Sequence, residues 1–257
     1  MEHIHLGENL KVKTVSENDS EGIFEIEGLS SGYGITVGNA LRRVLLSSLS
    51  GAAITQVKIK GVGHEFTTIE GVLEDIVEIL LNLKKVRFDF AVSYSDYETP
   101  EVLVLRKKGE GEVTAGDIKG TNLVSVVNKK QKIATITKKG VELEMELTVE
   151  KGLGYAPVES FKSDTLPVGV IQIDAIFSPV RKVNFVVENM RVGDRTDFNR
   201  VRLVIETDGT VAPSAALTKA VRILHDHFSR IAAEIGLDLT STEEEKKPVK
   251  KTKAAKK

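Results

Sequence analysis

The sequence contains no cysteine among its 257 residues. Without cysteine the chain can form neither disulfides nor thiolate metal sites, which suits a reducing cytosol. No apolar run approaches the ~18 to 20 residues that a membrane-spanning helix needs. The first residues, Met-Glu-His-Ile-His, also lack the basic segment and apolar stretch of a signal peptide. We therefore expect a soluble, cytoplasmic protein that makes no membrane contact.

The formal net charge of −1 hides an uneven distribution of charge along the chain. From Lys246 to the last residue there are seven lysines and no acidic residue, so residues 1–245 carry a formal charge of −8. An acidic body repels phosphate, which argues against a freestanding protein that binds duplex DNA. The lysine-rich end is either a disordered, solubilising tail or a weak and nonspecific contact for nucleic acid.

Three groups of residues are candidates for a ligand or metal site, and none has the spacing that such a site requires. Residues 32–38 precede a helix, but their glycines follow the pattern GxGxxxG rather than GxGxxG, and loop flexibility explains them more simply. His64 opens no zincin motif because no second histidine follows at the required distance. His225 and His227 are two residues apart and cannot share a helix face. We therefore expect no catalytic residue, no cofactor and no bound metal.

Residues 36–51 carry the most informative pattern, that of an amphipathic helix. Gly51 is expected to end this helix, because only glycine enters the left-handed conformation cheaply. Arg42 lies at the edge of the apolar stripe, whereas Arg43 points away from it beside Ser47. A core helix rarely needs two adjacent arginines, so we expect one of them to face a partner. The stripe consists of Val37, Ala40, Leu41, Val44, Leu45 and Leu49.

Alternating apolar and polar residues predict many strands. Residues 53–61 alternate as a strand with one wet face does, and the region from about 88 to 155 is expected to form a mostly antiparallel β subdomain. A turn is expected at Asp208-Gly209. The other clear strand candidates are residues 23–29, 102–105, 132–136, 141–147, 168–177, 182–188 and 201–206.

Two further helices are expected. The first covers about residues 68–85, with acidic residues early and lysines late, as the helix dipole favours. The second covers about residues 213–235 and opens at Pro213. Ala212 cannot supply the usual side-chain cap to this last helix, at a cost of ~1 kcal/mol. Its apolar positions follow a heptad spacing that suits either packing on its own domain or pairing with a second copy: Leu217, Val221, Leu224, Phe228, Ile231 and Ile235.

The segment Gly38-Asn39-Ala40-Leu41-Arg42-Arg43 closely resembles the first helix of the bacterial RNA polymerase alpha subunit family, in its N-terminal assembly domain. The resemblance covers about residues 4–236. It implies an α+β fold of two subdomains. A dimerisation subdomain with a mixed sheet and two long helices is formed by residues 1–49 and 172–236. A β-rich subdomain is inserted at residues 50–171, and residues 237–257 form a disordered, lysine-rich tail. The other matching stretches are residues 61–68, 74–84, 151–157, 174–180 and 195–197.

The resemblance implies a non-catalytic subunit of DNA-directed RNA polymerase, a nucleotidyltransferase. Two copies form a homodimer on which the β subunit and then the β′ subunit assemble, with omega and sigma in the holoenzyme. The implied β contacts are Arg43, Leu46, His64, Glu65 and Phe66, and the implied β′ contacts are Lys84, Ile173, Arg195, Thr196 and Asp197. The implied dimer interface consists of Val37, Leu41, Val44, Leu45, Leu217, Val221, Leu224, Phe228 and Ile231.

The chain departs from the family pattern at its end. The common alpha subunit continues through a linker into a second, small helical domain that contacts upstream DNA and activators. Here only residues 240–257 follow the assembly domain, so either the protein naturally lacks the second domain or this sequence is a truncated piece of a longer protein. The lysine-rich tail is then the one segment expected to contact DNA, weakly and without sequence preference.

Overall fold

The structure is a computed structural model that describes residues 10–90, 99–161, 167–192 and 195–236. It divides the chain into two compact units, the first ending at Ala220 and the second beginning at Val221. The boundary falls within helix α3 (Pro213–Glu234). The predicted tail, residues 237–257, lies outside the described residues.

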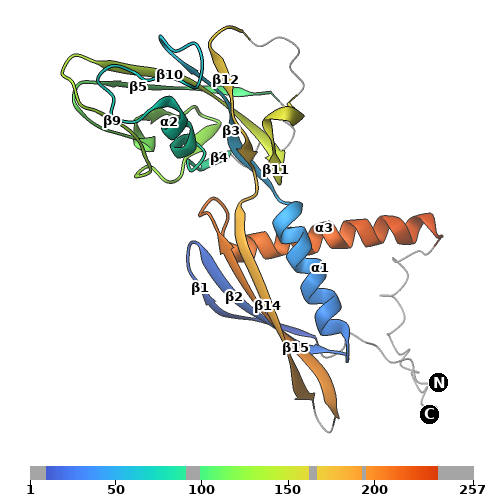
Figure 1. The fold of residues 1–257 in the computed structure, drawn as a ribbon. Helices are drawn as coiled ribbons and strands as arrows, with labels where there is room; N and C mark the ends of the chain where they lie inside the picture. Colours follow the sequence, from blue (N-terminus) through green and yellow to red (C-terminus); the bar gives the residue numbers. More distant parts are fainter. Residues whose placement is uncertain (1–9, 91–98, 162–166, 193–194, 237–257) are drawn as a thin grey trace, which may run out of the picture. The chain divides into compact units, whose positions relative to one another are not determined.

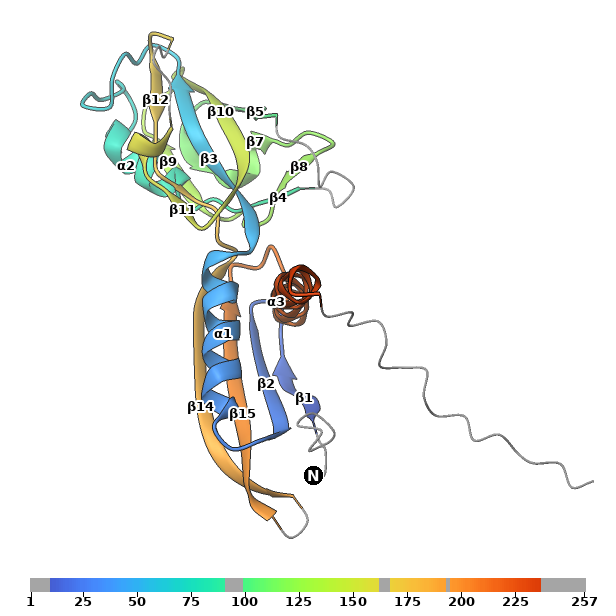
Figure 2. The same ribbon diagram turned by 90° about the vertical axis from the view of Figure 1, so that its right-hand side faces the viewer.

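The first unit contains a four-stranded sheet in the order β1-β2-β15-β14 (Figure 1). All its strand pairs are antiparallel, so the expectation of a mixed sheet was wrong, whereas the α+β class is confirmed. Helix α1 (Tyr33–Ser47) lies against β14 and β15, as Figure 2 shows. We call these four strands and α1 together the α1 sheet. The strands are β1 (Lys11–Glu17), β2 (Glu21–Leu29), β14 (Val180–Val192) and β15 (Arg195–Thr207).

The second part of the first unit is strand-rich, and we call residues 50–171 the insert. Its largest sheet has the order β7-β5-β10-β3-β4-β8, with β12 also paired to β3, and its strand pairs are antiparallel as expected. Helix α2 (Ile76–Leu83) packs into its core. The strands are β3 (Ser50–Ile59), β4 (Phe88–Phe90), β5 (Glu101–Lys108), β6 (Gly111–Thr114), β7 (Ile118–Lys119), β8 (Val124–Val126), β9 (Lys132–Ile136), β10 (Glu142–Leu153), β11 (Tyr155–Ala156) and β12 (Val170–Gln172), with short 3-10 helices at Ala115–Asp117 and Val158–Ser160. Strand β13 (Ala175–Ile176) follows the insert and pairs with β11.

Two of the three glycines at residues 32–38 serve packing, whereas Gly32 precedes α1 with a φ of 84°. Gly34 and Gly38 lie inside α1 and are buried. A Cβ atom on Gly34 would lie 2.6 Å from Val187 Cγ1, and one on Gly38 would lie 2.6 Å from the Phe185 ring. The two glycines therefore let the backbone of α1 approach the sheet closely. Leu41 and Leu45 continue the same buried face, as the apolar stripe predicted.

Gly51 does not end α1, contrary to the sequence interpretation. The helix stops at Ser47, and Gly51 lies in β3 without a positive φ angle. A Cβ atom there would lie 1.8 Å from the Phe177 carbonyl oxygen, so the glycine is needed for the close passage of two backbone segments. These segments, at the start of β3 and before β14, are the two chain connections between the α1 sheet and the insert.

Gly51→Ala is therefore expected to lower the free energy of unfolding by about 2 kcal/mol or more, because a backbone oxygen cannot yield as a side chain can. Chemical denaturation with urea measures this loss. Gly63→Ala is the matched control, since no atom lies within 4 Å of a Cβ at that position. Equal stability of the two variants would contradict the assignment of Gly51 to a close backbone contact.

Helix α2 is much shorter than the predicted helix over residues 68–85. Gly71 adopts a φ of 83°, and Asp75 caps the helix by accepting a hydrogen bond of 2.7 Å from the backbone N–H of Glu78. Consequently Leu73 is exposed, whereas Ile76 and Leu83 are buried. The apolar spacing upstream of Asp75 is compatible with a helix. However, the positive φ of Gly71 interrupts helical geometry and the Asp75 cap makes the helix begin at Ile76.

Glu74 was expected near the start of that helix and instead is a buried carboxylate of the insert. It accepts hydrogen bonds from Thr135 N (2.6 Å) and Thr135 Oγ1 (3.0 Å) and pairs with Lys132 Nζ at 3.0 Å. Burial raises the pKa of Glu74, but the ion pair and the hydrogen bonds outweigh burial and leave its pKa below the usual 4.5. The carboxylate thus ties the segment before α2 to β9.

The lowered pKa predicts a pH-dependent stability. A depressed folded-state pKa means that Glu74 contributes stability above pH 4.5, and this stability is lost as the pH falls through the lower folded pKa. Glu74→Gln is expected to cost about 1 to 3 kcal/mol at neutral pH and to flatten the acid side of the pH profile. Urea unfolding at several pH values measures both effects. Glu146→Gln, which alters an exposed ion pair with Lys58, is the control expected to change little.

The start of α3 is capped from a distance. Ala212 has no side-chain acceptor, but the Glu17 carboxylate accepts a hydrogen bond of 2.8 Å from the backbone N–H of Ser214. The end of β1 thereby supplies the cap that was expected to be missing from this helix. The boundaries of α3 itself agree with the prediction to within one residue.

Candidate assembly interface

The outer face of α1 presents two adjacent cations. Arg42 and Arg43 are both exposed, and Leu46 is half-buried beside them. The Arg43 carbonyl accepts a hydrogen bond of 2.8 Å from Ser47 Oγ, which fixes the backbone of the last turn. Among the described residues, no hydrogen bond or ion pair to the Arg43 guanidinium is present. A rigid helix thus holds a planar, permanently charged donor group toward solvent.

The inner and lateral face of α1 is apolar and only partly covered. Leu41 and Leu45 are buried against the sheet, whereas Val37 and Val44 are half-buried. Two of the four predicted dimer contacts on this helix therefore already belong to the core of their own chain. Val37 and Val44 retain surface that a second copy can cover.

The burial of the apolar stripe of α3 decreases along the helix. In the first unit Leu217 is buried, together with Ala216 and Ala220. In the second unit, from Val221 to Gly236, every residue is described and no side chain is buried. Leu224 is half-buried, and the remaining stripe residues are exposed: Val221, Phe228, Ile231 and Ile235, with Phe228 64% exposed. A helical segment with such a stripe lacks a core of its own.

The turn after β3 contains the predicted residues His64, Glu65 and Phe66. His64 is exposed, Glu65 is half-buried, and the Phe66 side chain is 80% exposed. The structure does not bring this turn next to Arg43, because the two lie at opposite ends of β3. Ten extended residues span about 30 Å. The predicted β contacts therefore form two separate patches, one on the α1 sheet and one on the insert.

Lys84 and Ile173 lie close together in the insert region, but neither is a free contact group. Lys84 Nζ pairs with Asp174 Oδ2 at 2.9 Å, and Val158 N donates a hydrogen bond of 3.1 Å to Asp174 Oδ1. The hydrogen bond from Lys84 and that from the Val158 backbone hold the pKa of Asp174 below its usual range. Ile173 is 4% exposed and packs with the core residues of the insert, so its side chain offers little surface to a partner, and its predicted β′ contact stays a prediction.

The third predicted β′ group lies at the start of β15. Thr196 and Asp197 are exposed, and the backbone of Arg195 pairs with Val192 of β14. β15 is 13 residues long, or roughly 40 Å. It ends beside Asp208, near the connections to the insert. The structure therefore keeps the Arg195–Asp197 group far from Lys84, along one long hairpin.

A metal site, a membrane-spanning helix and a ligand cleft are other features that the described part of the chain could contain. Within it, no group of three or more histidine, aspartate or glutamate side chains is placed to hold a metal ion. None of its helices has the length and apolar character needed to cross a bilayer. A cleft of about 420 Å³ lies between residues 50–52, 88–90 and 210–219, with Lys151 and Lys219 at its wall. The titratable side chains among its lining residues are Asp89, Lys151 and Lys219.

Comparison with known proteins identifies the family. The family model described as the RNA polymerase Rpb3/RpoA insert domain matches residues 57–178. The DNA-directed RNA polymerase subunit alpha of Roseiflexus castenholzii is 50% identical over 222 residues, which cover 86% of this chain and 67% of the relative. The chain belongs to the RNA polymerase alpha subunit family. The subunits alpha of Symbiobacterium thermophilum and Moorella thermoacetica are 46% and 45% identical, and the matches cover 73% and 75% of their lengths.

Membership in the alpha subunit family gives this chain a role in DNA-directed RNA polymerase, and thus in transcription. It confirms the resemblance drawn from the first helix and from the motifs at residues 61–68, 74–84, 151–157, 174–180 and 195–197.

The contacts that sequence reasoning missed are Glu17 at the start of α3, Glu74 in the insert, and the ion pair of Arg87 with Asp208. Each is a single charged residue whose partner is distant in sequence, so no spacing rule could reveal the pair.

Proposed function

We propose that this chain is the non-catalytic assembly subunit of a bacterial DNA-dependent RNA polymerase. Two copies dimerise through α1 and α3, and the dimer then binds the β subunit and afterwards the β′ subunit. In this proposal residues 1–49 and 172–236 form the dimerisation subdomain, and the insert supplies a second contact surface. The chain itself contributes no catalytic residue.

One observation carries the dimer part of the proposal. The part of α3 after Ala220 presents an apolar stripe but has no buried side chain. An isolated helix of this length is marginal in water, so its stability requires a partner surface. A second copy offers the same heptad seam and the half-buried Val37 and Val44 of α1. A four-helix contact between two copies buries all these groups at once.

The exposed arginine on α1 supports the recruitment of β. Arg43 lies outside the buried face and can form a bidentate pair with a carboxylate of the partner. Leu46 adds apolar contact next to it, and Phe66 with its neighbours His64 and Glu65 offers a second anchor on the insert. For β′, the proposal keeps Lys84 and the group Arg195, Thr196 and Asp197.

Stepwise reconstitution tests the proposal. The purified chain alone should be a dimer by light scattering after size exclusion. Adding β should give a complex of two copies with one β, and adding β′ should extend that complex by one further subunit. A monomeric chain, or a dimer that binds neither large subunit, would contradict the proposed role.

A further inference from the structure

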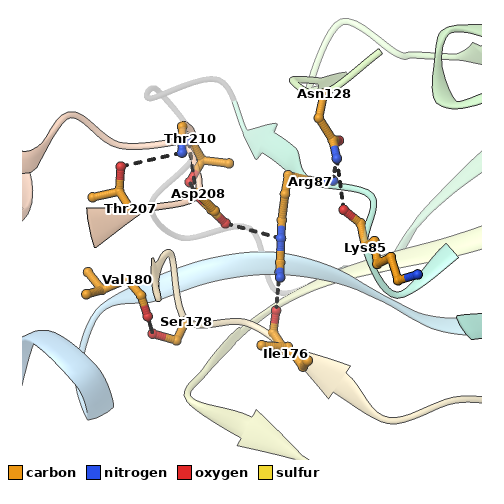
Figure 3. Close-up of polar contacts among 10 residues, drawn as sticks. Lys85, Arg87, Asn128, Ile176, Ser178, Val180, Thr207, Asp208 and Thr210 are labelled. Atoms are coloured by element: carbon orange, nitrogen blue, oxygen red, sulfur yellow. Dashed lines mark hydrogen bonds and ion pairs between the residues drawn. The ribbon is translucent and has the colours of Figure 1, made fainter. Parts of the chain in front are cut away.

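Arg87 occupies a fixed position between α2 and β4. Its backbone N–H donates a hydrogen bond of 2.7 Å to Asn128 Oδ1, and its carbonyl accepts one of 2.9 Å from Val127 N. Asn128 Nδ2 in turn donates to the Lys85 carbonyl at 2.8 Å. Both backbone groups of Arg87 are thus held by the insert, which fixes the point from which its side chain leaves the backbone (Figure 3).

The Arg87 side chain leaves the insert and reaches the end of the α1 sheet. Its Nη1 donates a hydrogen bond of 3.1 Å to the Ile176 carbonyl, and its Nε lies 3.5 Å from Asp208 Oδ2. The two side chains are 12% and 4% exposed. Figure 3 shows the guanidinium between Asp208 on one side and Ile176 on the other. Burial lowers the pKa of Arg87 and the Asp208 charge opposes this, while an arginine stays protonated throughout.

Asp208 is as firmly held as Arg87. Its Oδ1 accepts hydrogen bonds from Thr210 N (3.0 Å) and Thr210 Oγ1 (2.6 Å), and its own N–H donates to the Pro179 carbonyl at 2.9 Å. The carboxylate therefore sits in the turn that joins β15 to α3, beside the second chain connection at Pro179. The ion pair thus joins two groups that are each fixed on their own side.

The ion pair lies where the insert and the α1 sheet are joined by few other contacts. The two chain connections pass each other at Gly51 and Phe177. Next to them the facing surfaces leave the open cleft of about 420 Å³. Subdomains joined by two short connections and a small contact move relative to each other unless something holds them. Arg87 Nε makes no hydrogen bond within the described residues, so it contacts Asp208 through charge alone, at 3.5 Å. Removing one partner would leave the other charge buried and uncompensated.

We propose that Arg87 and Asp208 form a cross-tie that fixes the orientation of the insert on the α1 sheet. Both act as positioning residues. The functional consequence rests on the proposed assembly role: the β contacts Arg43 and Phe66 lie on different sides of this joint. Arg43 and Phe66 bind β as one bivalent surface only while the joint is rigid. If the joint is loose, binding of β at one contact gives a lower effective concentration of β at the other contact.

Spin-label distances test the cross-tie directly. The chain has no cysteine, so Val102→Cys in β5 and Asn184→Cys in β14 give one exposed label on each side of the joint. Val102→Cys with Ser125→Cys gives an internal distance within the insert. Labelled chain is mixed with excess unlabelled chain, so that each dimer contains one labelled copy. Distances are measured by pulsed electron resonance in the parent, in Arg87→Ala and in Asp208→Asn.

The expected result is a single narrow distance across the joint in the parent and its loss in both variants. The internal distance should remain narrow in all three proteins. The double variant should be no broader than either single variant, because each change already breaks the same pair. Glu206→Gln, which alters the exposed pair with Lys182 inside the α1 sheet, should leave the joint distance unchanged.

Two outcomes would overturn the cross-tie. One is an unchanged joint distance in both variants. The other is equal broadening of the internal distance, which would mean that the variants loosen the insert itself. These measurements need no β subunit, so they succeed or fail independently of the assembly role. With β present, Arg87→Ala should weaken β binding on the order of 10-fold to 100-fold while the dimer persists. Unchanged β binding alongside a broadened joint would overturn the bivalent part of the proposal.

Discussion

Leu224→Glu is expected to convert the homodimer into a monomer. Leu224 lies at the middle of the α3 stripe, with Val221 and Phe228 on either side at heptad spacing. In a symmetric interface each substitution occurs twice, so two carboxylates would be placed in an apolar seam. Burial of an unpaired charge costs far more than the seam gains from one leucine, and we expect the dissociation constant to rise about 1000-fold or more.

Sedimentation equilibrium over a range of concentrations measures this change. Ala233→Glu is the matched control, because it introduces the same charge at an exposed position on the opposite face of α3. This variant should remain dimeric. A Leu224→Glu protein that stays dimeric would mean that α3 packs elsewhere and that the dimer uses another surface.

Arg43→Ala is expected to leave the dimer intact and to weaken binding of β. The guanidinium is exposed on α1, on the face away from the sheet, so its removal opens no cavity in the chain. If Arg43 forms a bidentate pair in the centre of the β interface, its truncation should cost about 2 kcal/mol or more, or roughly 30-fold in affinity. Interferometry with immobilised dimer and soluble β measures the affinity.

Arg42→Ala provides the control for Arg43. The two residues are adjacent, carry the same charge and are both exposed, but they point to different sides of the helix. A general electrostatic attraction between the helix and β would make both variants equally weak. Only a larger loss in Arg43→Ala supports a specific contact, and wild-type affinity in that variant would remove Arg43 from the interface.

Long periodic segments were predicted well because burial on one face leaves a readable pattern. Helix α3 and strand β9 agree with the sequence interpretation, and the predictions at residues 141–147 and 201–206 cover about half of β10 and of β15. β1 was missed because its alternation of apolar and polar residues is short and breaks at Thr14-Val15, where the register with β2 also shifts. β3 was expected to have one wet face, but residues 52–55 are covered on both faces, since the start of the strand passes between other segments.

The errors concern residues whose role depends on distant parts of the chain. Gly51 follows an amphipathic helix and was interpreted as its stop, yet its contact is with Phe177. Glu74 follows a helical spacing, yet its partners are Lys132 and Thr135 on β9. Family resemblance indicated candidate contact surfaces that local pattern alone did not, and these surfaces stay predictions. Even so, it could not indicate that Ile173 would be buried in the core.

The mass of the complex that contains this chain in its native cell tests the central claim most directly. A tagged copy would be purified gently, and the intact complexes would be weighed by native mass spectrometry. The proposed role predicts two copies of this chain with one copy each of two much larger subunits. A bare homodimer without a large partner, isolated under the same gentle conditions, would contradict the role in polymerase assembly.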